Sequence, residues 1–110
     1  MKAVGTAYVK NCYNRYARKY FHEDVLPDFS SLDFEFAEYP RESGSVEFDE
    51  HGLPNLALDP FLRKRPCMLR STLLHEMIHL KLGPGKIRHG KEFYEEALRI
   101  ANIGGIRVWA

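Results

Sequence analysis

Apolar and aromatic side chains recur every three or four residues near the start of the chain, over residues 5–22. The recurring positions are Val9, Cys12, Tyr13, Tyr16 and Tyr20. This spacing is typical of an amphipathic helix, in which such tyrosines usually form the buried seam rather than a ligand-binding surface. The pattern therefore predicts a first helix packed against the rest of the molecule, and Pro27 ends this segment.

The pattern then changes to an alternation of apolar and polar residues, as expected for half-buried strands. The apolar positions are Leu32, Phe34, Phe36, Val46 and Phe48. Residues 39–44 and 49–52 contain the glycine, proline and aspartate typical of turns. A short apolar run over residues 55–58, closed by Asp59-Pro60, gives a third strand. We predict a meander of about three strands, mostly antiparallel.

Two further helices are expected in the second half of the chain. Pro66 suits a first helical position, and good helix formers continue to Leu82, where Gly83-Pro84-Gly85 ends the helix. A last helix over residues 90–102 is followed by Gly104-Gly105. Its predicted buried positions are Phe93, Ala97, Leu98 and Ala101. The fold class expected from this order is α+β.

Composition favours one compact domain over residues 1–110, because 110 residues leave room for one core. Apolar residues make up 45% and charged residues 28%, which is the balance of a globular protein. The net charge of +1 gives no overall attraction to nucleic acid or to a membrane. With no secretory leader and no long apolar run, a cytoplasmic protein with Cys12 and Cys67 as reduced thiols is expected, rather than a disulfide or a thiolate on a metal.

The main candidate for chemistry is the HExxH motif formed by His75, Glu76 and His79. Histidines four residues apart on a helix lie on one face, where both imidazoles can bind one Zn²⁺. Glu76 can then reach a water at the metal as a general base without binding the metal itself. The motif histidines could instead be structural, but burying two imidazoles and a carboxylate without a role is costly. His22 and His51 are expected to be solvated.

A catalytic zinc needs a third protein ligand and one position left open for water. His89 follows His79 by ten residues, and the glycine-rich break between them allows the chain to turn back. We assign His89 as the third ligand. The rival ligands are carboxylates of the last helix, namely Glu92, Glu95 and Glu96.

Residues 73–79 (LLHEMIH) followed by residues 89–93 (HGKEF) resemble the SprT-like metallopeptidase domain. Weaker similarity covers Tyr20-Phe21, Leu26-Pro27 and residues 56–58. The resemblance implies a minimal zincin-like fold, one Zn²⁺ bound by three histidines, and a glutamate base. These roles fall on His75, His79, His89 and Glu76.

Eukaryotic members of that family cleave proteins crosslinked to DNA, often with additional DNA-binding segments that are not seen in this sequence. Basic residues near the motif could form a phosphate-binding rim or simply a solvated face. They are Arg63, Lys64, Arg65, Arg70, Lys81, Lys86, Arg88 and Lys91. The spacing does not fit two other zinc families: metzincins would need glycine at Leu82 and histidine at Gly85, and endoribonucleases with three histidines lack the HExxH glutamate.

The expected activity is hydrolysis of peptide bonds in a protein or peptide substrate. Zn²⁺ would activate a water and polarise the carbonyl, while Glu76 would transfer the proton to the leaving amine. An extended substrate could pair with the exposed edge of the strand at residues 55–58. Tyr94 and Arg88 are the residues considered for stabilising the oxyanion. The alternatives are a non-proteolytic, zinc-stabilised module that binds protein or DNA, and a zinc hydrolase acting on a small amide.

Overall fold

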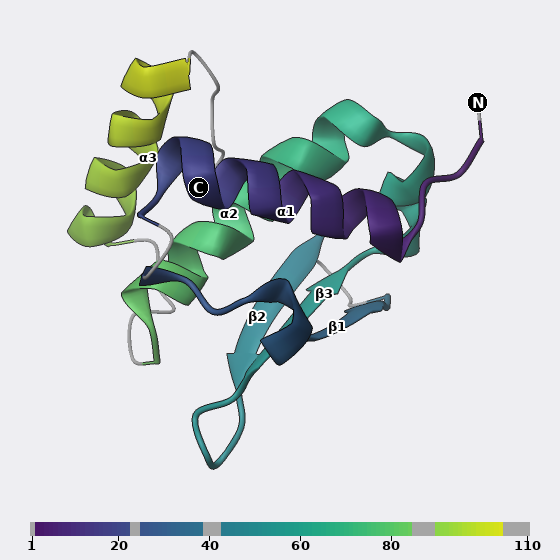
Figure 1. Ribbon diagram of the computed structural model, residues 1–110, viewed down its shortest axis with the longest axis horizontal. Coiled ribbons are helices and arrows are strands. Elements are labelled where there is room, and N and C mark those ends of the chain that lie inside the picture. Colours follow the sequence, from purple (N-terminus) through teal and green to yellow (C-terminus); the bar gives the residue numbers. More distant parts are fainter. Residues whose placement is uncertain (1, 23–24, 39–42, 85–89, 105–110) are drawn as a thin grey trace.

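The computed structural model describes the chain except for residues 1, 23–24, 39–42, 85–89 and 105–110 (Figure 1). Its described part has an α+β fold with helices on one side of a mixed sheet. The α-helices are α1 (Thr6–Tyr20), α2 (Pro66–Leu82) and α3 (Lys91–Gly104). The strands are β1 (Asp33–Phe36), β2 (Gly44–Phe48) and β3 (Pro54–Leu58), and the short 3₁₀ helices are η2 (Phe29–Ser31) and η3 (Pro60–Lys64).

The first helix lies within the predicted range of residues 5–22, ends two residues earlier than expected, at Tyr20, and has the buried seam that the sequence predicts. All five side chains of the predicted seam are buried. The Tyr13 hydroxyl donates a hydrogen bond to the carbonyl oxygen of Pro27 at 2.6 Å, which attaches the returning segment to the helix. Arg18 and Lys19 lie in the last turn, where positive charge interacts favourably with the helix dipole. The prediction of this helix is confirmed.

The sheet differs from the predicted meander in its strand order. The order is β1-β3-β2, so β3 lies in the centre, parallel to β1 and antiparallel to β2. The sheet is therefore mixed, and the expectation of successive antiparallel strands is wrong. The prediction of an exposed strand edge at residues 55–58 is also wrong, because both edges of β3 are hydrogen-bonded to neighbours.

Two local features explain this order. Asp49 accepts hydrogen bonds from the backbone of His51 and Leu53, and Gly52 has φ of +80°, so β2 and β3 form a hairpin. In β3, three consecutive residues, Leu56, Ala57 and Leu58, are buried. Ala57, which pairs with Glu35 and Ser45, has neighbouring strands on both sides that bury its small side chain, whereas β1 and β2 keep exposed residues between less exposed ones.

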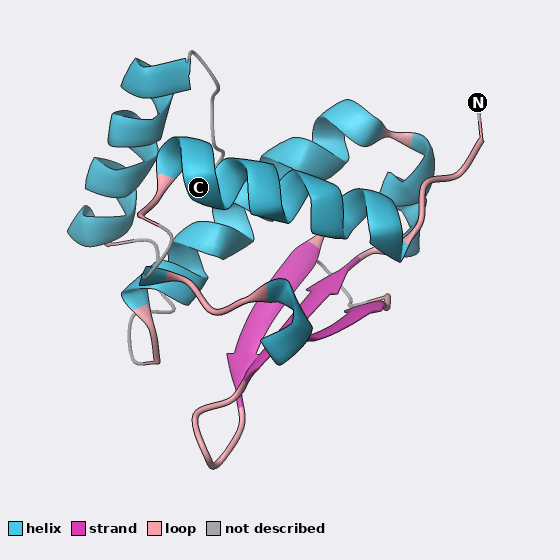
Figure 2. Ribbon diagram, in the orientation of Figure 1, coloured by secondary structure: helices cyan, strands magenta, loops and turns pink. Residues whose placement is uncertain are grey.

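Helix α2 packs against β2, β3, α1 and α3, and it is the central element of the molecule. Figure 2 shows the helices gathered on one side of the strands. Residues on the opposite face of the sheet are exposed and polar: Asp33, Glu35, Glu47 and Asn55. The apolar core lies between the sheet and the helices, and residues from every strand pack in or against it.

The bounds of α2 agree with the sequence signals. Pro66 occupies the first turn, where its missing N–H costs no helical hydrogen bond. Gly83 follows the helix with φ of +81°, a conformation that favours glycine, and its N–H bonds to the carbonyl of His79. Eight side chains of α2 are buried, so the motif helix lies within the core rather than on the surface.

Helix α3 closes the fold over α2 and the end of α1. Phe93 and Ile100 are buried and Ala97 is partly buried, but Leu98 is 63% exposed, so its predicted core position is wrong. The buried face of α3 instead includes Glu96. None of the helices in the described part of the chain combines the length and apolar character that a membrane span requires.

Candidate metal centre

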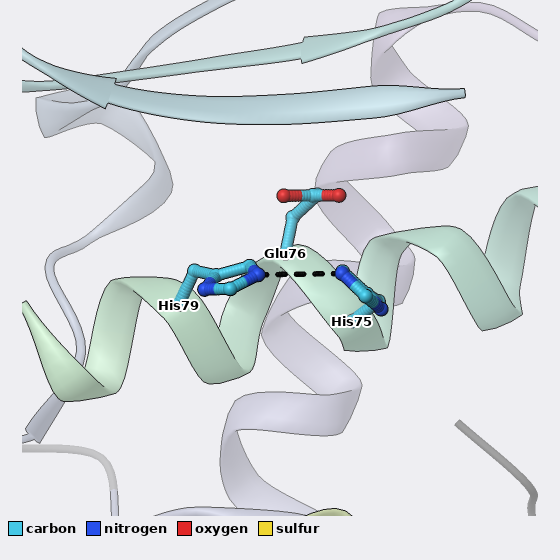
Figure 3. Close-up of side chains that lie close together, drawn as sticks. All are labelled: His75, Glu76 and His79. Carbon is cyan, nitrogen blue, oxygen red and sulfur yellow. Dashed lines mark hydrogen bonds between the residues drawn. The ribbon is translucent and has the colours of Figure 1, made fainter. Parts of the chain in front are cut away.

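The two motif histidines lie one turn apart on α2, and their rings point toward one another (Figure 3). The Nε2 atoms of His75 and His79 are 3.3 Å apart, and the ring centroids are 5.0 Å apart. His79 is buried and His75 partly buried. The helical spacing therefore brings the two imidazoles together on one face of α2, as the sequence predicts.

This separation fits a zinc ion as the shared partner. Two nitrogens bound to one Zn²⁺ at 2.0–2.1 Å with a tetrahedral angle would lie about 3.3–3.4 Å apart. The observed distance of 3.3 Å matches this value. It also allows one neutral imidazole to donate a hydrogen bond to the other when no metal is bound.

Glu76 belongs to the same group. Its carboxylate and the two imidazoles offer three ligand atoms within 4.8 Å of one another, the one such group of three or more found in the described residues. The Glu76 side chain is only 5% exposed and projects toward the strands above α2 (Figure 3). A carboxylate at this distance can either contact a water held beside the histidines or approach a metal directly.

An aromatic side chain of α3 packs against both imidazoles. The ring centroid of Phe93 is 4.7 Å from that of His75 and 4.9 Å from that of His79. Phe93 is completely buried. The sequence indicates only a core position for Phe93, because its contact with the histidines depends on how α3 packs on α2.

A buried carboxylate, Glu96, connects α3 to α2 and α1. Glu96 is 6% exposed and accepts hydrogen bonds from Lys81 of α2 and Arg99 of α3. Arg99 also donates to the carbonyl oxygen of Tyr20 at the end of α1. Burial alone would raise the pKa of Glu96, but the hydrogen bonds from Arg99 and Lys81 outweigh this effect and lower it. The sequence indicates Glu96 only as a rival metal ligand; its place on the apolar face of α3, one turn after Phe93, is the signal that could have indicated a buried, paired carboxylate.

The third ligand remains a prediction. His89 and Arg88 lie outside the described residues. Of the rival ligands, Glu96 is held by Lys81 and Arg99, and Glu95 is exposed and lies 3.8 Å from Lys91. Glu92 is exposed in the first turn of α3 and does not belong to the metal-binding group defined among the described residues.

Other residues singled out in the sequence differ in their exposure. Tyr94 is 56% exposed on α3. His22 and His51 are exposed, as predicted, and both cysteines are free thiols, with Cys12 buried and Cys67 exposed.

Three arginines of the predicted basic rim contact the fold directly. Arg63 donates to the carbonyl oxygen of Val4, Arg65 to that of Phe61, and Arg70 to the hydroxyl of Tyr8. The hydrogen bond to Tyr8 raises the pKa of Arg70. These contacts give the three arginines a structural role in the fold.

No protein-family model matches the chain, and its sequence matches no curated protein in the comparison.

Proposed function

We propose that the protein is a zinc-dependent metallopeptidase of the SprT-like, zincin-like type. The observation that carries this proposal is the 3.3 Å separation of the His75 and His79 Nε2 atoms, with the Glu76 carboxylate in the same group. The resemblance of residues 73–79 and 89–93 to the SprT-like domain supports it. His75, His79 and His89 would hold the ion.

The proposed chemistry assigns separate roles to the metal and to Glu76. Bound Zn²⁺ would supply a Lewis acid that polarises the scissile carbonyl and lowers the pKa of water. Glu76 accepts a proton from the attacking water on a carboxylate oxygen and returns it to the leaving amine, which separates the two peptide fragments. The low exposure of Glu76 keeps this carboxylate away from bulk water, where its interactions would be screened.

The corrected strand order changes where a substrate would bind. In the described residues, β2 is hydrogen-bonded to β3 alone, so its other edge can accept an extended peptide. Strand β2 also packs against α2, the helix that carries the motif. Backbone pairing along this edge would favour unfolded segments of proteins with little sequence preference, including segments of DNA-associated proteins.

The test compares wild-type protein with Glu76→Gln, using zinc analysis and cleavage of an unfolded protein substrate. We expect about one Zn²⁺ per wild-type chain. We also expect the Gln variant to keep its zinc but to cleave about 10²- to 10⁴-fold more slowly, because the general base is lost. Glu50→Gln, in the exposed hairpin turn, is the matched control and should cleave like the wild type.

Retained cleavage in Glu76→Gln would contradict the proposed mechanism. A wild-type protein that binds zinc and cleaves neither proteins nor peptides would instead be the non-proteolytic binding module. Absence of any bound divalent ion at neutral pH would contradict both functions.

A further inference from the structure

The orientation of the two imidazoles is not determined by α2 alone. Helical spacing places His75 and His79 on one face, but the outer torsion of a histidine side chain has broad energy minima. Each ring can therefore turn its Nε2 atom away from the shared point unless something packs against it. The hydrogen bond possible at 3.3 Å between the two Nε2 atoms favours the observed orientation, and a side chain packed on both rings would restrict them further.

Phe93 provides a surface that contacts both rings. Its centroid lies 4.7 and 4.9 Å from the two imidazole centroids, with interplanar angles of 55° for His75 and 36° for His79. These distances are in the range of favourable aromatic packing. Because Phe93 is completely buried, it has little room to move away from the histidines.

The position of Phe93 is in turn fixed by the ion pairs of α3. Glu96, one turn further along α3, is bonded to Lys81, which lies two residues after His79 on α2. At the far end of α3, a Cβ on Gly104 would lie 2.3 Å from the Tyr20 hydroxyl, so the helix is packed tightly on α1. Helix α3 is therefore held against the motif helix one turn after Phe93, and against α1 at its far end.

We propose that Phe93 is a positioning residue that holds the rings of His75 and His79 in the orientation in which both Nε2 atoms face one metal ion. This inference rests on the proposed function, since it assigns the histidines to a shared ion. Groups that orient metal ligands typically change metal affinity by about 10- to 100-fold when they are removed.

The test measures the Zn²⁺ affinity of full-length Phe93→Leu by competition with a chelator, at a temperature where the variant is folded. Ile100→Val is the matched control, because Ile100 is also completely buried on α3. We expect Phe93→Leu to bind Zn²⁺ about 10- to 100-fold more weakly than wild type. Ile100→Val should stay within about threefold of wild type, because a small loss of core packing away from the rings leaves the ligands in place.

The absorption spectrum of the Co²⁺-loaded protein gives a second readout, which depends on coordination geometry and not on fold stability. It should change in Phe93→Leu and stay as in wild type in Ile100→Val. Equal affinities and equal spectra for Phe93→Leu and wild type would overturn the inference, as would equal weakening in both variants.

The two proposals can fail separately. If the wild-type protein binds Zn²⁺ but cleaves nothing, the peptidase proposal is wrong. The Zn²⁺ affinities of Phe93→Leu and Ile100→Val then still test the role of Phe93. If the wild-type protein cleaves its substrate and Phe93→Leu binds Zn²⁺ as tightly as wild type, only the positioning role of Phe93 is wrong. If the wild-type protein binds neither Zn²⁺ nor Co²⁺, both the peptidase proposal and the positioning role of Phe93 are wrong.

Discussion

One helix supplies three side chains of the candidate site, namely His75, Glu76 and His79. Their spacing of one and three positions is local, so the helix itself brings the two imidazoles together and places the carboxylate beside them. Phe93 is different, since it is 14 residues from His79 and reaches the rings only because α3 folds back onto α2.

The third ligand is the residue-scale prediction. We expect His89→Ala to reduce Zn²⁺ affinity by more than the roughly 10- to 100-fold that loss of a supporting group causes, because it removes a bond to the ion. By comparison, Glu92→Ala should change the Zn²⁺ affinity by less than about threefold. Equilibrium dialysis with zinc analysis measures both.

Glu95→Ala serves as the control, because Glu95 is an exposed carboxylate of the same helix. The assignment of His89 is wrong if Glu92→Ala loses the metal while His89→Ala retains it.

At the scale of secondary structure elements, α3 combines an apolar face with one buried carboxylate. Lys81 and Arg99 surround Glu96, so α2 and α3 are joined by charge as well as by apolar packing. A buried carboxylate that loses its charge would leave both cations without their anionic partner, which makes this contact sensitive to acid.

The element-scale prediction concerns the pH dependence of stability. The pKa of Glu96 in the folded protein lies below its ordinary value of 4.5, so the folded state binds fewer protons than the unfolded state in this range. The contribution of Glu96 is therefore present above about pH 4.5 and is lost as the pH falls through the lowered pKa. We expect Glu96→Gln to be less stable at pH 7 and to lose less stability on acidification than wild type.

Urea unfolding between pH 7 and pH 3, with a chelator present to remove bound metal, measures this difference. Glu95→Gln is the control and should follow the wild-type curve, because Glu95 is exposed. If Glu96→Gln lost as much stability on acidification as wild type, the ion pair would not be the acid-sensitive contact.

At the scale of the whole molecule, the motif helix lies between the sheet and the other two helices. Strands β2 and β3 contact this helix, and so do α1 and α3. The helix that carries the candidate metal centre is therefore packed against other elements on several sides. A ligand that binds only the folded arrangement of α2 and α3 should therefore stabilise the whole fold.

The whole-molecule prediction is a rise in Tm on adding Zn²⁺. At a free concentration 100 times the Kd, the expected stabilisation is about 2.7 kcal/mol. For a small domain each kcal/mol shifts Tm by roughly 4–8 °C, so the change is easily seen by calorimetry. Double substitution of His75 and His79 by Ala should abolish the shift, and a shift that persisted in that variant would place the stabilising metal elsewhere.

The sequence by itself determined the features that depend on neighbouring residues. Helical periodicity gave α1 and its buried seam, Pro66 and Gly83 gave the ends of α2, and the i, i+4 spacing gave the histidine pair, because each depends on contacts within a few residues.

Only the tertiary structure decided the strand order, the contact of Phe93 with the histidines, and the burial of Glu96 beside Lys81. These features join segments that are distant in the chain, and several arrangements satisfy the same local pattern. Which arrangement forms depends on how the apolar faces of all the elements can be buried together while every buried charge is paired. The apolar run at residues 56–58 predicted a third strand, but its central place in the sheet depends on packing across the whole sheet.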